Sequence, residues 1–441
     1  MNRKIASTLY FSLQDLRGEP VRKILDELMR TQSYSLHHLT ELQAIRTKTI
    51  LVHAVENVPY YRENYKSFRS QIYEVNHPEE LETLMKDLPV LSKQKVLEHF
   101  NEFRADSFLE RKSTNNITSG SSGNPLMFPC DNQSWAHRHA NVYRVLKMYG
   151  VEPGDPYGYL FGLHWKKKSR RKVRFKDLLF NRVRVSAFSI SRDTVPESFE
   201  KLRKKKVNHF IGYPSAMYDF IVLSDELGLP VRDLGLKCIM GSAEPFLPFQ
   251  REAIEALTGS RCIDYYGSVE GGPGAFEGPE GLMQQFMESS YLYVNSSNEI
   301  FTTDYNLFSF PLIKYQIGDF VAQWHTSNRP LTFAHKLFGS VSGRSGTPIL
   351  LPNGNTINAN VPSYIFKNMA GKRKILSYRF VHDTSKKTLK LFIVPLTKSL
   401  NSLKEELEQE IRVGLECPCE IHFINELPNL PNAKHRDYIE V

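Results

Sequence analysis

Residues 118–125, ThrSerGlySerSerGlyAsnPro, have the types and spacing that suit phosphate binding. Two glycines and four hydroxyls lie within the first six residues, so backbone N–H groups and side-chain hydroxyls can surround phosphate oxygens. The stretch lacks the Gly-Lys-Ser/Thr ending of a Walker loop, which argues against ordinary P-loop chemistry. A surface turn rich in Ser and Gly explains the same residues, so this motif alone leaves both interpretations open.

Four further motifs, taken in chain order, each supply a different part of a nucleotide site. TyrTyrGlySerValGlu (265–270) places an aromatic face and a carboxylate four residues apart, and TyrGlnIleGlyAsp (315–319) offers an Asp that can accept hydrogen bonds from vicinal hydroxyls such as those of ribose. GlyArg (343–344) adds a fixed cation, and AsnAlaLysHisArg (432–436) adds a lysine near the end of the sequence. Singly, each motif has an ordinary structural explanation. Together and in this order they indicate a nucleotide site.

An α/β scaffold is expected to position these motifs. From Lys201 onward, short apolar stretches alternate with turns and helical patterns, which is typical of parallel strands. The stretches are VNHFIG, a Gly-Tyr-Pro-Ser turn at 212–215, AMYDFIVLSDELG, LKCIMGSAEPF, QREAIEAL and RCIDYYG. Before them, the first hundred residues have a helical pattern, with apolar positions at Leu39, Leu42, Ile45, Val52 and Val55 and a helix stop at Pro59.

The sequence after Ser290 changes to hairpin patterns. YLYV and EIFTTD flank a Ser-Ser-Asn turn, and ILSYRFVH and TLKLFIVPL flank a polar turn in the last hundred residues. A helix then carries an apolar stripe at Leu403, Leu407, Ile411 and Leu415 and a capping box from Ser402 to Glu405, before a last strand, EIHFI. The Gly- and Ser-rich residues 339–346 predict a linker or hinge.

Composition limits the class of protein. The chain has 441 residues, 41% of them hydrophobic, which suits about two to four domains. Five cysteines are too few and too scattered for a disulfide scaffold, and the lone Cys-Pro-Cys lacks a second pair for zinc. No run approaches about 18 uninterrupted apolar residues, and the first segment is too polar for a signal sequence. We therefore expect a cytoplasmic protein. The cysteines are Cys130, Cys238, Cys262, Cys417 and Cys419.

The formal net charge of +9 is largely local. Eight basic residues lie between Lys166 and Lys176, and a second basic cluster runs from Arg203 to Lys206. Such a run can bind nucleic acid or an anionic membrane face, and a solvated loop beside the cleft of an anionic ligand explains it equally. No zinc finger, RNA-recognition signature or basic leucine zipper is present. We expect no nucleic-acid partner, and an anionic ligand or peripheral membrane association through residues 166–176.

Taken together, the motifs resemble the adenylate-forming superfamily of acyl-CoA synthetases, peptide-synthetase adenylation domains and luciferases, and in particular its phenylacetate-CoA ligase branch. Four other stretches are similar to stretches at matching positions in that branch, so the resemblance covers nearly the whole chain. They are ProTyrTyrArgGluAsn (59–64), LeuProValLeuSerLys (88–93), GlyTyrProSerAla (212–216) and GlySerAlaGluPro (241–245). FNRVRVSAFSIS (180–191) resembles branch members found with genes for capsular and surface polysaccharides.

The resemblance implies an α/β fold with two domains. A large N-terminal α/β domain, residues 1–345, would bind ATP and substrate. A small mobile C-terminal α+β domain, residues 346–441, would carry a catalytic lysine. Gly346 occupies the hinge position, where a glycine absorbs large backbone rotations at little steric cost.

The resemblance also implies a two-step reaction that uses ATP and Mg²⁺. A small-molecule carboxylate attacks the α-phosphorus of ATP to give an acyl-adenylate and pyrophosphate, and a thiol or an amine then displaces AMP. Bringing an anion to a polyanion is the physical difficulty, so catalysis should rest on charge neutralisation and alignment rather than on a covalent nucleophile.

Residue roles follow from the resemblance position by position. Glu270 would hold Mg²⁺, Asp319 would take the ribose hydroxyls with Arg344 nearby, and Lys434 would stabilise charge at the α-phosphate. Tyr266, followed by Gly267 and Ser268, would lie against the adenine ring. The β- and γ-phosphates would bind Thr118, Ser119, Gly120, Ser121, Ser122 and Gly123, and the adenine wall would include Gly241, Ser242, Ala243, Glu244 and Pro245.

Several positions depart from the family pattern. Asn124 replaces a lysine of the phosphate loop, Val269 stands where a hydroxyl is common, Ile317 replaces a threonine, and Thr347 replaces an aspartate after the hinge. The core charged set is retained. Coenzyme A is the expected acceptor. The alternatives are an amide-forming ligase that uses an amine, such as an amino sugar in surface-polysaccharide biosynthesis, and a catalytically inactive nucleotide-binding homologue.

Overall fold

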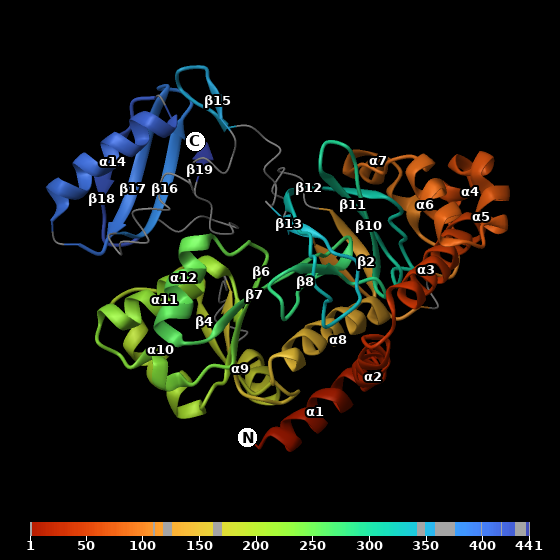
Figure 1. Ribbon diagram of the computed structural model, residues 1–441, viewed down its shortest axis with the longest axis horizontal. Coiled ribbons are helices and arrows are strands. Elements are labelled where there is room, and N and C mark those ends of the chain that lie inside the picture. Colours follow the sequence, from red (N-terminus) through yellow and green to blue (C-terminus); the bar gives the residue numbers. More distant parts are fainter. Residues whose placement is uncertain are drawn as a thin grey trace. The chain divides into compact units, whose positions relative to one another are not determined.

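The chain divides into two units, each assembled from two separate stretches of sequence. The parallel-sheet unit contains Asp155–Ile263 and Ser342–Val441, and the antiparallel-sheet unit contains Asn2–Gly154 and Asp264–Val341. Strand β7 (Arg261–Ser268) passes from the first to the second. The structure is a computed structural model (Figure 1) that describes residues 2–108, 111–117, 126–161, 170–341, 349–357, 375–397, 399–415, 417–427 and 438–440.

The predicted domain boundary between residues 345 and 346 lies outside the described ranges. It therefore stays a prediction, as does the hinge at Gly346. The mixed helix and sheet content agrees with the predicted α/β class.

Four parallel strands form the sheet of the parallel-sheet unit, in the order β4-β3-β5-β6, followed by the first residues of β7. The predicted strand, turn and helix cadence after Lys201 is confirmed. Strands β3 and β4 and helix α9 were not predicted from the sequence. The elements are β3 (Tyr157–Phe161), α9 (Arg170–Leu179), β4 (Arg182–Ser186), the short 3₁₀ turn Ala187–Ser189, α10 (Val195–Lys205), β5 (His209–Gly212), α11 (Pro214–Glu226), the 3₁₀ turn Val231–Leu234, β6 (Cys238–Ser242) and α12 (Pro248–Thr258).

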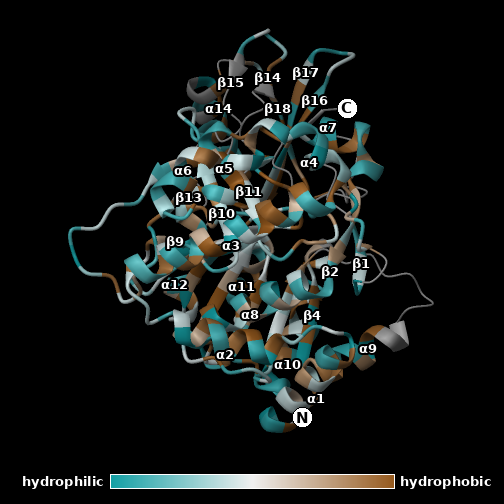
Figure 2. Cartoon of the chain, turned by 90° about the vertical axis from the view of Figure 1, so that its right-hand side faces the viewer, coloured by the Kyte–Doolittle hydropathy of each residue, from teal (hydrophilic) through white to brown (hydrophobic). Residues whose placement is uncertain are grey.

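Helices α11 and α12 lie side by side (Figure 1), and Tyr218 of α11 packs edge-on against Phe249 of α12 with ring centroids 5.4 Å apart. Helix α11 is buried on most of its surface because AMYDFIVL carries apolar side chains all round. Helix α10, by contrast, mixes hydrophilic and hydrophobic residues (Figure 2), as an amphipathic surface helix does. The helices thus supply one hydrophobic core to this unit.

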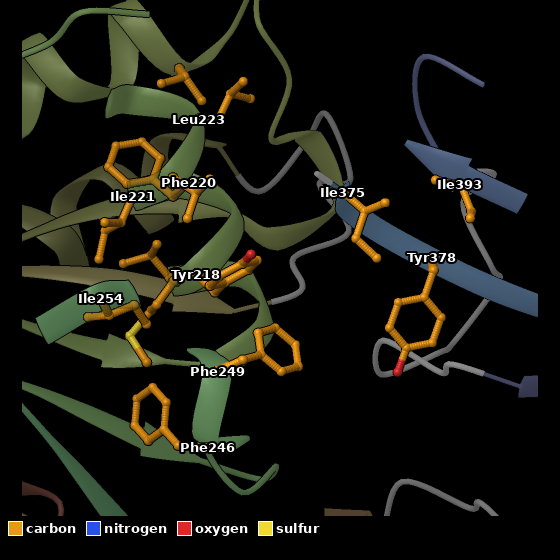
Figure 3. Close-up of a cluster of buried hydrophobic side chains, with 14 of the residues drawn as sticks. Tyr218, Phe220, Ile221, Leu223, Phe246, Phe249, Ile254, Ile375, Tyr378 and Ile393 are labelled. Atoms are coloured by element: carbon orange, nitrogen blue, oxygen red, sulfur yellow. The ribbon is translucent and has the colours of Figure 1, made fainter. Parts of the chain in front are cut away.

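The C-terminal stretch of this unit forms its own sheet, in the order β18-β17-β16-β19. The predicted hairpin is confirmed, with Phe380 opposite Leu391, and the stripe from Leu403 to Leu415 is buried. Ile375 and Tyr378 of β16 join the core cluster that contains Tyr218 and Phe249 (Figure 3). The elements are β14 (Ile349–Leu350), β15 (Thr356–Ile357), β16 (Ile375–Asp383), β17 (Thr388–Pro395), α14 (Leu400–Leu415), β18 (Glu420–Phe423) and β19 (Tyr438–Glu440).

The antiparallel-sheet unit combines a helical N-terminal stretch with three groups of strands: the two-stranded sheet β1-β2, the strands β8 and β9 that end the seven-stranded sheet, and a four-stranded sheet. The rest of β7 pairs antiparallel with β8, and β8 with β9. The four-stranded sheet has the order β10-β11-β12-β13, and the predicted hairpin after Ser290 is confirmed by Tyr291 opposite Thr303. The strands of the whole antiparallel-sheet unit, besides the end of β7, are β1 (Ser113–Ile117), β2 (Met127–Asp131), β8 (Gly272–Glu277), β9 (Met283–Gln285), β10 (Ser290–Val294), β11 (Glu299–Asp304), β12 (Tyr315–Trp324) and β13 (Gly339–Val341).

The helices of this unit match the predicted helical pattern of the first hundred residues. Helix α3 ends just before Pro59, which is the first residue of the next helix, where its missing N–H costs nothing. No helix in the described part of the chain combines the length and apolarity needed to cross a bilayer. The helices are α1 (Arg3–Leu16), α2 (Val21–Thr31), α3 (Leu36–Asn57), α4 (Pro59–Asn64), α5 (Arg69–Glu74), α6 (Pro78–Asp87), α7 (Lys93–Glu98) and α8 (Asn132–Met148), with 3₁₀ turns at Lys66–Phe68 and Phe100–Phe103.

Two local predictions were wrong, and a third was wrong in part. Ile45 is 63% exposed, because the buried row of α3 runs through Leu39 and Thr47 instead, and the Thr47 hydroxyl is satisfied by donating to the Gln43 carbonyl oxygen. Ser402 does not cap α14, since the helix begins at Leu400 and its first turn is closed by a hydrogen bond from Leu403 N to the Ser399 oxygen. The linker expected at 339–346 is wrong for its first three residues, because Gly339–Val341 form strand β13 and pair with β12. The rest of that stretch, residues 342–346, lies outside the described ranges and stays a prediction.

Candidate active site

The turn after β7 carries the Glu270 carboxylate. Glu270 is 7% exposed, and within the described ranges its carboxylate has no hydrogen-bond or ion-pair partner. The turn itself is closed locally, because Ser268 Oγ accepts a hydrogen bond from Gly271 N at 2.7 Å. Thr302 Oγ1 of β11 donates to the Gly271 carbonyl oxygen at 3.0 Å. A buried acidic group is thus held on a well-bonded turn at the end of a strand.

Tyr266 and Asp319 are brought together in the antiparallel-sheet unit although they are 53 residues apart in sequence. The Tyr266 hydroxyl donates to Asp319 Oδ2 at 3.1 Å. The Tyr266 ring lies nearly parallel to Phe338, at 15° and a centroid separation of 6.5 Å. Gly318, with φ of +81°, takes the left-handed conformation just before Asp319. The structure therefore unites two of the predicted nucleotide-binding residues, with Glu270 four residues from one of them.

The Gly241–Pro245 stretch lies at the carboxyl end of β6 in the parallel-sheet unit. Glu244 Oε2 accepts hydrogen bonds from Ser215 Oγ at 2.7 Å and from Ser215 N at 3.4 Å, at the start of α11. Two stretches that share the family resemblance, 212–216 and 241–245, are thus joined by direct contacts. The carboxyl ends of parallel strands are where open α/β sheets bind ligands.

Close packing explains the small residue at position 241. A Cβ on Gly241 would lie 2.5 Å from a ring atom of Phe246. Ala243 takes a positive φ of +71°, an uncommon conformation for a residue with a side chain. Backbone strain of this kind concentrates at functional sites, which agrees with the predicted role of this stretch.

Aromatic residues line the same strand ends. Tyr213 packs edge-on against Phe161 with ring centroids 4.9 Å apart, and Phe161 lies 4.6 Å from Tyr159. Burial, with the nearby Glu244 carboxylate and Tyr159 hydroxyl, raises the pKa of Tyr213 to about 12. Tyr213 therefore stays a neutral hydroxyl at physiological pH, available as a hydrogen-bond donor rather than as a base.

The strands on either side of the predicted phosphate loop form a hairpin, and the loop residues themselves lie outside the described ranges. Strands β1 and β2 pair antiparallel, and Ile117 lies opposite Met127, so the two ends of the loop are adjacent. The residues from Thr118 to Gly123, and Asn124, Arg344, Gly346, Thr347 and Lys434, all lie outside the described ranges. Their roles stay predictions.

Two departures from the family pattern have a packing explanation. Val269 and Ile317 both pack against the hydrophobic cluster that includes Phe128, Phe310 and Tyr315. At these two positions an apolar side chain extends the core. The neighbouring hydroxyl of Ser268 accepts a hydrogen bond from Gly271 N and so closes the turn.

The residues that support the Glu270 turn were missed by the sequence analysis. They are Ser134 and Arg138 on α8 and Thr302 and Asp304 on β11. The separations from the turn range from about thirty to more than a hundred residues, so no local pattern links them to Glu270. Only the arrangement of the sheets shows the connection. Among the described residues, no three His, Cys, Asp or Glu side chains gather as a metal-binding cluster.

Comparison with known proteins agrees with these motifs, although no protein-family profile matches the chain. The phenylacetate-coenzyme A ligase of Aromatoleum evansii is 24% identical over 371 residues, which are 78% of this chain and 78% of that protein. The phenylacetate-coenzyme A ligase of Escherichia coli K12 is 23% identical over 368 residues, covering 76% and 78%.

A solved structure shares the fold. A 2-hydroxyisobutyryl-CoA ligase, crystallised in its postadenylation state with an acyl-adenylate, superimposes with a TM-score of 0.71 at 18% identity, over 93% of this chain and 91% of that one. We conclude that the chain has the fold of the adenylate-forming enzymes and is a distant relative of their phenylacetate-CoA ligase branch.

Proposed function

We propose that this protein is an ATP-dependent, AMP-forming ligase that activates a small carboxylate as its acyl-adenylate and passes the acyl group to coenzyme A. The hydrogen bond between Tyr266 and Asp319, with the Glu270 turn at the end of the same strand, carries the proposal. Tyr266 would supply an aromatic face for the base, Asp319 a carboxylate for the ribose hydroxyls, and Glu270 a carboxylate for the cation. A nucleoside triphosphate with its metal needs these three functions.

In the first step, a carboxylate oxygen forms a bond to the α-phosphorus of ATP while the bond to the bridging oxygen of pyrophosphate breaks. In the second, the thiol sulfur of coenzyme A attacks the acyl carbon, loses its proton, and AMP leaves with the electron pair of the broken C–O bond. The protein supplies alignment and charge. Asp319 would fix the ribose hydroxyls and Tyr266 the adenine plane, so that the α-phosphorus is presented to the incoming carboxylate.

Glu270 fits the role of a Mg²⁺ ligand. It is a buried carboxylate without a partner in the described part of the chain, which is costly unless a cation or a hydrogen-bond donor satisfies it. Mg²⁺ commonly takes one or two carboxylates together with substrate phosphates and water, so a site with one protein carboxylate suffices. Bound there, the ion would screen the phosphate charges.

The remaining roles belong to residues outside the described ranges. Residues 118–123 would receive the β- and γ-phosphates, Arg344 would lie near the ribose, and Lys434 would approach the α-phosphate when the C-terminal domain closes about Gly346. The support is the order of the motifs and the hairpin β1–β2, which holds both ends of the phosphate loop together.

Coenzyme A is the acceptor we favour because the curated relatives named above are coenzyme A ligases. An amine acceptor, as in surface-polysaccharide biosynthesis, is the outcome that a product analysis would show instead. Offering coenzyme A and an amino sugar together with ATP, and identifying the products by mass spectrometry, separates a thioester from an amide. A product mixture without any thioester would refute the assignment of the acceptor.

Carboxylate-dependent exchange of labelled pyrophosphate into ATP tests the first step. We expect exchange with at least one acid of a broad panel, and its collapse in Glu270→Gln. Glu152→Gln is the matched control, because it removes the same charge from a surface pair with Lys147 at the end of α8. Absence of exchange with every acid in the wild type would favour the inactive homologue over an enzyme.

The basic run at 166–176 has one described element, helix α9. Arg174, Lys176, Phe175 and Leu178 are all exposed on it, and Asp177 is held by Arg182 and Arg184 at 2.6 Å each. The charge of Asp177 is thus balanced by the two arginines of β4. The exposed surface of the helix is then cationic and also carries two apolar side chains, Phe175 and Leu178. We infer that this surface, called the α9 surface below, binds an anionic membrane face peripherally.

A further inference from the structure

We propose that Arg138 is the positioning residue for the Glu270 carboxylate, and that its guanidinium determines how strongly the site binds Mg²⁺. The inference rests on the proposed function, since it assigns Arg138 a role at the cation site of the adenylation reaction. Nothing in the order of sequence motifs indicates it. The Arg138 side chain, on α8, contacts the backbone of the turn after β7 directly.

Arg138 binds the two peptide groups that precede Glu270. Its Nη1 donates to the Ser268 carbonyl oxygen, and its Nη2 donates to the Val269 carbonyl oxygen at 2.8 Å. The peptide bond between Val269 and Glu270 is therefore held at its oxygen by a charged donor. Because the Glu270 side chain leaves the backbone one atom beyond that peptide, rotation of the peptide would swing the carboxylate away.

The guanidinium is itself fixed. Its Nη2 also lies 3.2 Å from Asp304 Oδ2, which accepts a hydrogen bond from Ser134 Oγ at 2.7 Å. The Asp304 Oδ1 atom accepts from Asn306 N at 2.9 Å, and Asp304 is 2% exposed. The Trp135 ring lies against the Arg138 guanidinium, 5.5 Å from centroid to Cζ. Arg138 is thus oriented by groups on two elements, α8 and β11.

The other side of the turn rests directly on β11. A Cβ on Gly271 would lie 2.3 Å from Thr302 Cγ2, and a Cβ on Gly272, whose φ is +75°, would lie 2.8 Å from Asp304. The turn therefore approaches β11 more closely than any residue with a side chain allows. Arg138 holds the turn from α8 while Thr302 and Asp304 support it from β11, and Glu270 lies between these two sets of bonds.

Arginine suits this position better than lysine. Its planar fork offers several donors in fixed directions, so one side chain can bind two carbonyl oxygens and a carboxylate at once. A lysine ammonium at the end of a flexible stem would keep the charge without the fixed geometry. The side chain of Arg138 is 12% exposed, so these bonds are largely shielded from water.

A purely structural role would make Arg138 matter for folding alone. A positioning role predicts a specific change in metal binding, because groups that orient a metal ligand typically alter metal affinity by about 10- to 100-fold when removed. The two roles are separated by comparing ATP affinity with and without Mg²⁺ in the same protein.

Calorimetric titration of the full chain with ATP, once in EDTA and once in Mg²⁺, gives the factor by which the metal raises ATP affinity. For Arg138→Ala we expect this factor to fall about 10-fold or more, with the affinity measured in EDTA unchanged. Glu270→Gln defines complete loss of the factor. Arg138→Lys should fall between Arg138→Ala and wild type. Lys147→Ala removes another cation of α8 and should leave the factor as in wild type.

Thr302→Val guards against a folding defect in the arginine variants. This substitution removes the hydrogen bond to the Gly271 oxygen, on the opposite side of the turn, at nearly constant side-chain volume. We expect it to lower the factor by which Mg²⁺ raises ATP affinity, but by less than Arg138→Ala does. A folded Arg138→Ala protein with the wild-type factor would overturn the inference while leaving the proposed function intact. If Arg138→Ala does not fold, wild-type factors in both Arg138→Lys and Thr302→Val overturn it. A wild type without any metal enhancement or pyrophosphate exchange would refute the proposed function itself.

Discussion

Replacing Tyr266 by Phe removes one hydroxyl from the candidate site and leaves the aromatic ring in place. The ring position does not depend on the hydroxyl, because Gly274 packs beneath the ring and Phe338 lies parallel to it. A Cβ on Gly274 would lie 2.8 Å from Tyr266 Cδ1. The substitution therefore isolates the hydrogen bond to Asp319 from the stacking surface.

The expected size follows from that one bond. A hydrogen bond to a charged group contributes about 1.5–3 kcal/mol when buried, and both partners here are only half-buried. Because this bond orients Asp319 before ATP binds, its loss adds the cost of ordering the carboxylate on binding. We take that cost as about 1–1.4 kcal/mol, which corresponds to roughly a five- to tenfold weaker ATP affinity. Asp319 without its orienting partner should also discriminate less between ATP and 2′-deoxy-ATP.

Titration calorimetry of ATP and 2′-deoxy-ATP against wild type and Tyr266→Phe measures both effects. Tyr265→Phe is the matched control, since it removes a hydroxyl from the adjacent residue of β7, whose ring packs against Phe286. Unchanged or tighter ATP binding in Tyr266→Phe, or an unchanged penalty for 2′-deoxy-ATP, would show that the hydrogen bond does not prepare Asp319 for ribose.

Three further predictions concern other parts of the molecule. Lys434→Ala should lower pyrophosphate exchange by about 100-fold or more while ATP still binds, as removal of a group that stabilises developing charge does; exchange at the wild-type rate would contradict the assigned role. Glu288→Gln should cost about 3–5 kcal/mol of stability in denaturant unfolding, because it leaves the fully buried Arg144, 2.7 Å away, without its counter-charge. Burial acts to raise the pKa of Glu288, but Arg144 and His335 outweigh it and hold the pKa well below its ordinary 4.5. The stabilisation from the Glu288–Arg144 pair is therefore fully present above about pH 4.5 and is lost as the pH falls. If the thermal midpoint of Glu288→Gln were as acid-sensitive as that of the wild type, this reasoning would be refuted. The α9 surface should bind vesicles containing phosphatidylglycerol and not pure phosphatidylcholine, with binding weakened by salt and by the double substitution Phe175→Ser, Leu178→Ser; equal binding to both vesicle types would refute an electrostatic contribution.

The sequence predicted the parts of the fold that local patterns specify. The alternation of apolar stretches with Gly-Tyr-Pro-Ser and Gly-Ser-Ala-Glu-Pro was enough to identify β5, α11 and β6, since each stretch has its own turn signal. Strand β4, RVRVS, was not identified, because its two arginines interrupt the apolar pattern that indicates a strand. They are retained there by pairing with Asp177 of α9, a contact that no local pattern indicates.

The candidate site was predicted to a similar extent. Tyr266 and Asp319 could be named from their motifs, whereas the hydrogen bond that joins them is seen only in the structure. Arg138 could not be named, because its partners are backbone oxygens 130 and 131 residues away. Every residue has a carbonyl oxygen, so no residue type in the sequence identifies such a partner. Support of a ligand through its peptide backbone depends only on tertiary structure.

The division of each unit between two stretches has a consequence for synthesis of the chain. Residues 155–263 leave the ribosome well before Ile375 and Tyr378, which share their hydrophobic cluster. During that interval the apolar side chains of Tyr218 and Phe249 lack part of the surface that covers them in the finished protein. The packing of this cluster is therefore completed only after the last hundred residues have been translated.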